Sequence, residues 1–164
     1  MTESVTADSI EAQIERFFGG VRELSAAVDT LSPDAFLGPL GNWSPRDIVA
    51  HLIGWNRYAV LGAEQLLKGE LPFYDKDPGE DYCNVNASLV AEYPSENRTE
   101  LLAEHEKAAS ELALFLRSLS PQEWGRDSGV EFDGEALSIR ETVDEIIEDH
   151  LYHSAQIRDW AAGK

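Results

Sequence analysis

Three histidines stand at positions where their ring nitrogens can serve as metal ligands. His51 lies one turn after Ile48 and borders the apolar face of a helix, and His150 and His153 lie on the apolar face of the last helix. Imidazole binds zinc, nickel and related divalent ions, which need at least three protein ligands to leave one position open for chemistry. The residue types predict a metal centre, with a hydrogen-bonded core histidine as the alternative at each position.

The third ligand has two candidates on the last helix. Asp149 precedes His153 by four residues and His150 precedes it by three, and both spacings place side chains on one face of a helix. The helical wheel puts His150 nearer the centre of the apolar seam and Asp149 toward its edge. The residues by themselves leave both candidates open.

Tyr58 and His105 are candidates for moving protons, on their position alone. His105 falls on the apolar stripe of the third long helix, although its neighbours Glu104 and Glu106 are typical of a solvent-facing boundary. Nearby aromatic residues either wall a pocket beside His51 or simply fill the core. These residues are Trp43, Trp55, Tyr58, Tyr74 and Tyr82.

Apolar residues recur at helical spacing through most of the chain and predict four long helices. The predicted helices span about 10–31, 45–68, 95–119 and 138–162. Gly, Pro and Asp dominate the connection over 69–83, and a short extra helix is expected at 84–93. We therefore expect an all-α fold, a single four-helix-bundle domain over 1–164 with a long crossover between helices two and three.

Depth along the helices decides whether His51 and His153 can meet. His51 lies seven residues past the predicted cap Ser44, and His153 lies nine residues before Ala162. At ~1.5 Å rise per residue, the two lie within ~3 Å of one level if their helices are antiparallel, but ~12 Å apart if parallel. The long crossover permits the antiparallel arrangement.

Composition narrows the classes of partner and the location. The formal net charge of −18 repels phosphate backbones and anionic lipids, so we expect neither nucleic acid nor membrane as a partner. Cys83 is the only cysteine, and residues 1–4 lack the basic start of a signal peptide, so we expect a cytoplasmic protein. A phosphate-binding glycine loop, a paired-cysteine zinc motif and a Gly-x-Ser-x-Gly elbow are all missing from the sequence.

Two segments resemble the signatures of a known family. Residues 43–55, Trp-Ser-Pro-Arg-Asp-Ile-Val-Ala-His-Leu-Ile-Gly-Trp, resemble the second-helix signature of the DinB/YfiT-like superfamily of four-helix-bundle metalloproteins. Residues 153–158, His-Ser-Ala-Gln-Ile-Arg, resemble its fourth-helix signature. Residues 81–86, Asp-Tyr-Cys-Asn-Val-Asn, look most like the ClbS/DfsB-type branch.

The resemblance implies a metal triad of one histidine from helix two and a pair four residues apart on helix four. His51 and His153 match, and the remaining place falls on Asp149, where the usual pattern has histidine; His150 is the alternative third ligand. Aspartate is an acceptable ligand for divalent ions. The implied cofactors are a divalent metal ion, foremost zinc or nickel, and in some members a low-molecular-weight thiol.

The same resemblance implies a metal-dependent enzyme of the thiol transferase or hydrolase type. Its partner would be a small molecule, electrophiles included, in detoxification or stress response, and a homodimer is one option because family members often dimerise. Two alternatives stay open, which leaves enzyme activity itself undecided. One is a non-catalytic bundle that binds a small molecule, and the other is a structural or dimerising bundle with a degenerate metal site.

Overall fold

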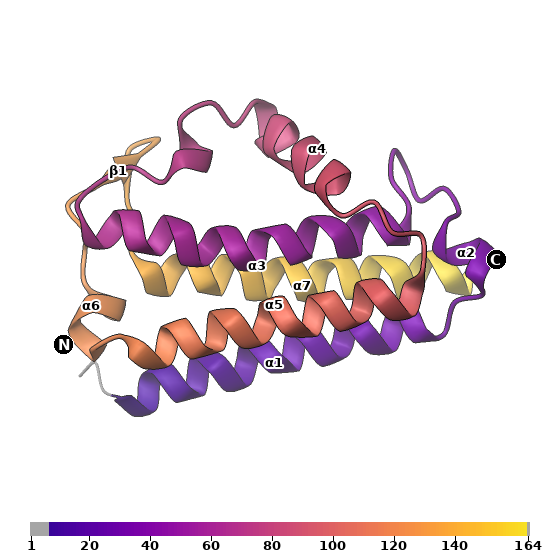
Figure 1. The fold of residues 1–164 in the computed structure, drawn as a ribbon, viewed down its shortest axis with the longest axis horizontal. Helices are drawn as coiled ribbons and strands as arrows, with labels where there is room; N and C mark the ends of the chain where they lie inside the picture. The colour runs from indigo at the N-terminus through magenta and orange to yellow at the C-terminus, as the bar shows by residue number, and fades with distance from the viewer. Residues whose placement is uncertain (1–6, 164) are drawn as a thin grey trace.

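Four long helices form a bundle in the computed structural model, which describes residues 7–163 (Figure 1). Residues 1–4, considered above for a signal peptide, lie outside the described residues. The long helices are α1 (Ala7–Asp29), α3 (Pro45–Leu67), α5 (Arg98–Ser118) and α7 (Ile139–Ala162). Helices α1 and α7 run in one direction, and α3 and α5 run in the opposite direction (Figure 1). The expected all-α bundle is confirmed, and α3 and α7 are antiparallel.

Side-chain caps set where the long helices begin. Ser44 and Asp47 form a reciprocal capping box at the start of α3, with Pro45 as its first residue. Ser138 accepts a hydrogen bond from the backbone N–H of Glu141 at the start of α7. Helix α5 begins at Arg98 rather than near residue 95, because the side chain of Asn97 caps it.

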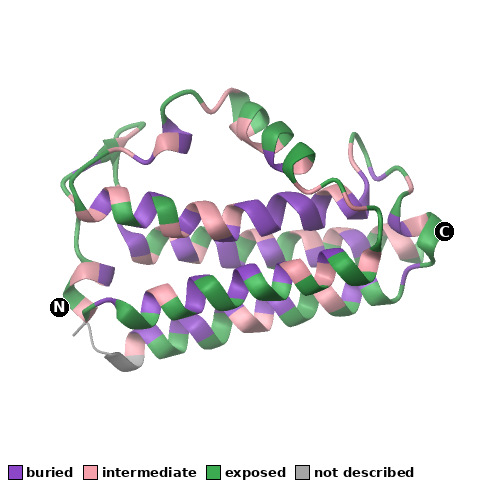
Figure 2. Ribbon diagram, in the orientation of Figure 1, coloured by how far each residue is buried: buried purple, intermediate pink, exposed green. Residues whose placement is uncertain are grey.

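The predicted long crossover joins α3 to α5 and contains the predicted short helix. It comprises the 3₁₀ turns η1 (Phe73–Asp75) and η2 (Glu80–Tyr82) and helix α4 (Cys83–Glu92). Helix α4 lies over the outer face of α3 (Figure 1). Gly54 allows this close approach, because a Cβ atom there would lie 2.3 Å from Cδ2 of Leu89. Residues 48–54 of α3 are consequently buried on every side, as Figure 2 shows.

The apolar stripes of the long helices meet in two core clusters. One cluster holds the first half of α1 with the second halves of α3 and α5, and the other holds the opposite ends. Between the two clusters lies a layer of buried polar side chains, formed by Asn56, His105, His150 and Ser154. The bundle interior is therefore apolar at both ends and polar near the middle.

Short elements connect the long helices. They are α2 (Pro33–Phe36), α6 (Pro121–Gly125) and an antiparallel hairpin of β1 (Glu131–Phe132) and β2 (Glu135–Ala136). The hairpin precedes α7 and lies near the crossover (Figure 1). Among the described helices, none combines the length and the apolar character needed to cross a lipid bilayer.

Candidate metal centre

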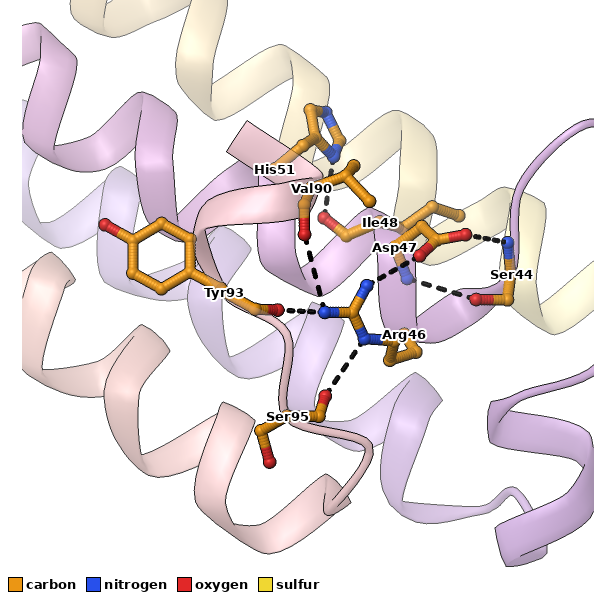
Figure 3. A network of polar contacts seen from close by, with 8 residues as sticks. All are labelled: Ser44, Arg46, Asp47, Ile48, His51, Val90, Tyr93 and Ser95. Atoms are coloured by element: carbon orange, nitrogen blue, oxygen red, sulfur yellow. Dashed lines mark hydrogen bonds and ion pairs between the residues drawn. The ribbon is translucent and has the colours of Figure 1, made fainter. Parts of the chain in front are cut away.

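His51 is held in one orientation by the helix that carries it. Its Nδ1 lies 2.7 Å from the carbonyl oxygen of Ile48, one turn earlier on α3 (Figure 3). Only 2% of the residue is exposed, because α4 and the bundle cover both sides of this part of α3. The ring contacts that of His153 on α7 edge to face, with the ring centres 5.0 Å apart.

Asp149 bridges the two histidines. Its Oδ2 lies 3.3 Å from Nε2 of His51, and its Oδ1 lies 3.3 Å from Nε2 of His153. Asp149 and His153 are four residues apart on α7, so both project from one face of that helix. The three ligand atoms lie within 4.8 Å of one another. The structure thus brings His51, Asp149 and His153 together.

The hydrogen bonds of the two rings determine which nitrogens carry hydrogen. Nδ1 of His51 faces the carbonyl of Ile48, and Nδ1 of His153 lies 2.8 Å from Oε1 of Gln156. Both partners only accept, so the neutral form of either ring has its hydrogen on Nδ1 and the lone pair of Nε2 directed toward Asp149. Three lone-pair donors then converge without a hydrogen among them. That donor set fits a divalent cation such as zinc or nickel.

Electrostatics favour a metal ion over a proton at this position. Burial lowers the pKa of His51 more than the contact with Asp149 raises it, so the ring is neutral near neutral pH. Burial also acts to raise the pKa of Asp149, but hydrogen bonds that His153 and His51 donate in their protonated form outweigh that effect and hold the pKa well below its ordinary value. A cation held between the three residues would favour the carboxylate in the same way. A neutral imidazole and an ionised carboxylate are the forms that bind metals.

Arg46 supports the site by tying the start of α3 to the chain beyond α4 (Figure 3). Its Nε donates to the carbonyl of Ser95 at 2.9 Å, and its Nη2 donates to the carbonyls of Tyr93 and Val90. Its Nη1 pairs with the carboxylate of Asp47 at 2.7 Å. These contacts hold the C-terminal end of α4 against α3, next to the turn that carries the first histidine.

The triad opens into a cavity of about 1220 Å³. Its walls come from α3, α7, the crossover and the β hairpin, and its aromatic lining comprises Trp43, Trp55, Tyr74, Tyr82, Phe132 and Tyr152. The ring of Trp43 packs edge-on against His51 at 4.7 Å and stacks over His153 at 6.5 Å. Cavities that combine aromatic walls with a few polar groups are where proteins bind small molecules.

The other sequence-based candidates lie elsewhere. His150 points into the core, where its Nε2 lies 2.9 Å from Nε2 of His105 and its ring meets Phe17. Tyr58 packs against Phe73 with 4.7 Å between ring centres, and burial raises its pKa. None of His105, His150 and Tyr58 is among the described residues that line the cavity.

Three residues of the site were not predicted from the sequence. Gln156 orients His153, and its position three residues later in the helix was a usable signal. Asp75 and Glu145 line the cavity but come from the crossover and from α7. Their separation in the chain left no local pattern to find.

Fold and site together define a helical bundle with a candidate metal-binding triad beside a small-molecule cavity. Residues 8–157 match the DinB superfamily. This chain therefore belongs to the DinB superfamily, as the resemblance predicted. No curated protein sequence matches it.

Solved structures share the fold at low sequence identity. The colibactin self-resistance protein ClbS, crystallised with a dsDNA, has a TM-score of 0.74 at 16% identity, covering 92% of this chain and 93% of that one. An uncharacterised protein from Escherichia coli UTI89 has 0.70 at 18%, covering 99% and 96%. A mycothiol-dependent maleylpyruvate isomerase has 0.69 at 18%, covering 94% of this chain but 63% of its own. At these identities the likeness establishes the fold alone.

Proposed function

We propose that this protein is a metal-dependent enzyme of the thiol transferase or hydrolase type that acts on a small molecule. The observation that carries the proposal is the convergence of the lone pairs of His51, His153 and Asp149 beside the cavity. A bound divalent ion would lower the pKa of a thiol or a water so that a nucleophile exists near neutral pH. Detoxification of electrophiles is the role that best suits such a nucleophile.

The residues of the chain have separate tasks in this proposal. Ile48 and Gln156 fix the hydrogens of the two rings and leave both Nε2 atoms free to bind. Trp43 covers both rings and excludes water from that side. Proton transfer by Tyr58 or His105 stays a prediction, and either residue would have to act through a neighbour because neither lines the cavity.

The triad beside the cavity also favours a second candidate function. In this alternative, the protein binds and sequesters a small molecule without catalysis. Retention of a ligand without any product after prolonged incubation would support this candidate over the enzyme. The expectation that nucleic acid is not a partner rests on the net charge of −18 alone. ClbS, which shares the fold, was crystallised with dsDNA, and this finding counts against the expectation. Homodimerisation and a cytoplasmic location also stay predictions.

The metal content of the full-length protein, purified without a histidine tag, tests the proposal. We expect inductively coupled plasma mass spectrometry to find about one divalent ion per chain. The variants His51→Ala/His153→Ala and Asp149→Ala should lose it. Asp159→Asn, which removes an exposed carboxylate from the same helix, should retain it. Wild-type protein that holds no ion, or triad variants that hold as much as wild type, would refute the metal centre.

Turnover is measured on the metal-loaded protein. Monobromobimane with a small thiol reports transfer, and a nitrophenyl ester reports hydrolysis. The enzyme proposal expects a rate above background that disappears when a chelator removes the ion and returns when the ion is added back. A rate unchanged by the chelator would contradict metal-dependent catalysis.

A further inference from the structure

The cavity wall carries a strongly negative charge. Besides Asp149, six carboxylate side chains line it, those of Asp75, Asp81, Asp133, Glu135, Glu145 and Glu148. Neither lysine nor arginine occurs among the described lining residues. Such a wall repels anions and concentrates cations in the cavity.

Of these carboxylates Asp75 is buried, whereas Glu145 is an exposed residue of the lining that is near enough to feel the charge of Asp75. Asp75 is only 6% exposed, and its Oδ1 accepts a hydrogen bond of 2.8 Å from the hydroxyl of Tyr82. Burial raises the pKa of Asp75, and burial and the neighbouring Asp75 raise that of Glu145. A buried carboxylate such as that of Asp75 normally faces a cation. No lysine or arginine of the described cavity lining supplies one here.

Aromatic rings surround the same position. Trp55 meets Tyr82 edge to face with 5.5 Å between ring centres, and it meets Tyr74 at 5.1 Å. Tyr74 adjoins Asp75 in the 3₁₀ turn η1. Aromatic faces beside carboxylates attract ammonium and guanidinium groups through their ring quadrupoles.

The position formed by Asp75 and Glu145 lies at a defined distance from the triad. Glu145, Asp149 and His153 follow one another at four-residue spacing on α7, and all three line the cavity. Four residues of helix span about 6 Å. A ligand held at Glu145 therefore reaches the triad across about one helical turn.

We propose that the cavity binds an organic cation, with its ammonium or guanidinium group held by Asp75 and Glu145 among Trp55, Tyr74 and Tyr82. The remainder of the molecule extends toward the triad. This inference names the ligand class of the proposed site, and it rests on the proposed function only for what happens at the triad end. Small anions are the class that such a cavity rejects.

Calorimetric titration of the full chain with three probes of one shape tests the inference. The probes are benzylammonium, benzyl alcohol and benzoate, which differ in charge and little else. We expect benzylammonium to bind at least about tenfold more tightly than benzyl alcohol, because hydrogen bonds to charged groups are the strong ones. Benzoate should bind least.

Isosteric variants test whether the preference for benzylammonium arises at Asp75 and Glu145. Asp75→Asn/Glu145→Gln keeps the shapes and the acceptor for the Tyr82 hydroxyl, and it should bring benzylammonium to the affinity of benzyl alcohol. Glu15→Gln on α1, which contributes no described residue to the lining, should leave the tenfold preference intact. Equal binding of the three probes, or a preference that survives the double substitution, would overturn the inference.

The experiment separates this inference from the metal proposal. Titrations are carried out on chelator-treated protein and on His51→Ala/His153→Ala, where the preference for benzylammonium should persist even if no metal centre exists. Loss of the preference in these samples would show that the cation position depends on the triad, against the inference. Magnesium is titrated in parallel, and magnesium binding that Asp75→Asn/Glu145→Gln abolishes and that displaces benzylammonium would identify an inorganic cation site instead.

Discussion

His105 and His150 face each other in the middle of the bundle, with 2.9 Å between their Nε2 atoms. Nδ1 of His150 donates to the carbonyl of Ile146 at 2.8 Å, so its Nε2 carries no hydrogen and accepts one from His105. The Nδ1 of His105 is left without a hydrogen-bond partner. Both residues are fully buried, and burial lowers the pKa of His105 well below its ordinary value and that of His150 to about 4.

This pair should make the protein sensitive to mild acid. The folded state keeps both rings neutral, whereas the unfolded chain protonates each near pH ~6.5. The unfolded state then binds more protons, so the free energy of unfolding falls as the pH drops below ~6.5, by about 3 kcal/mol for His150 once its folded pKa is reached. Urea unfolding of chelator-treated protein across this range measures the loss. The variant His105→Leu/His150→Leu should show a flatter profile, and an identical slope would exclude the pair as the cause.

Gln156 should tune the affinity of the proposed metal centre. Gln156→Leu removes the acceptor that holds Nδ1 of His153, and partners of this kind are worth about 10–100-fold in metal affinity. Gln156→Glu replaces the amide by a carboxylate and should strengthen binding, because a charged acceptor makes the ring more basic. Competition with a chromogenic chelator measures both variants. Equal affinities in the two would contradict this role.

Arg46 should contribute far more to stability than an exposed arginine. Arg46→Ala removes the partner of one carboxylate oxygen of Asp47, whose other oxygen still accepts from Ser44. It also leaves the backbone carbonyl of Ser95 without this donor, so we expect the free energy of unfolding to fall by about 3 kcal/mol. Arg16→Ala breaks an exposed ion pair with Asp144 and should cost less than about 1 kcal/mol. Urea unfolding compares the two, and hydrogen exchange should show α4 opening in the first variant only. Similar losses would mean that Arg46 does not anchor the crossover.

Two helical glycines should respond to the same substitution with opposite signs. Alanine favours a helix interior over glycine by about 1 kcal/mol, and a Cβ at Gly19 meets nothing nearer than a side-chain atom of Arg22 at 3.9 Å. Gly19→Ala should therefore stabilise. Gly54→Ala drives a methyl group into Leu89 and should destabilise by about 2 kcal/mol. Thermal unfolding of both variants tests the signs, and a stabilised Gly54→Ala would show that α4 packs loosely.

Local information in the chain was enough to predict the long helices and the crossover. The spacing of apolar residues gives the buried face of each helix, and Ser44 with Pro45 marks where α3 begins. The start of α5, predicted near residue 95, was misplaced by about three residues, because the side chain of Asn97 caps the helix. Capping depends on which of several polar side chains turns toward the helix, and neighbouring candidates look alike in a sequence.

The sequence by itself determined the depth of His51 and His153 along their helices, because rise per residue is constant. Tertiary structure alone decided that α3 and α7 run antiparallel and bring the two rings together (Figure 1). Tertiary structure also decided which of the two candidates for the third ligand lies beside His51, namely Asp149 and not His150. A helical wheel gives the average direction of burial, which points His150 into the core toward His105. The neighbour at each edge of that face depends on how four helices pack, and only packing places Asp149 beside α3.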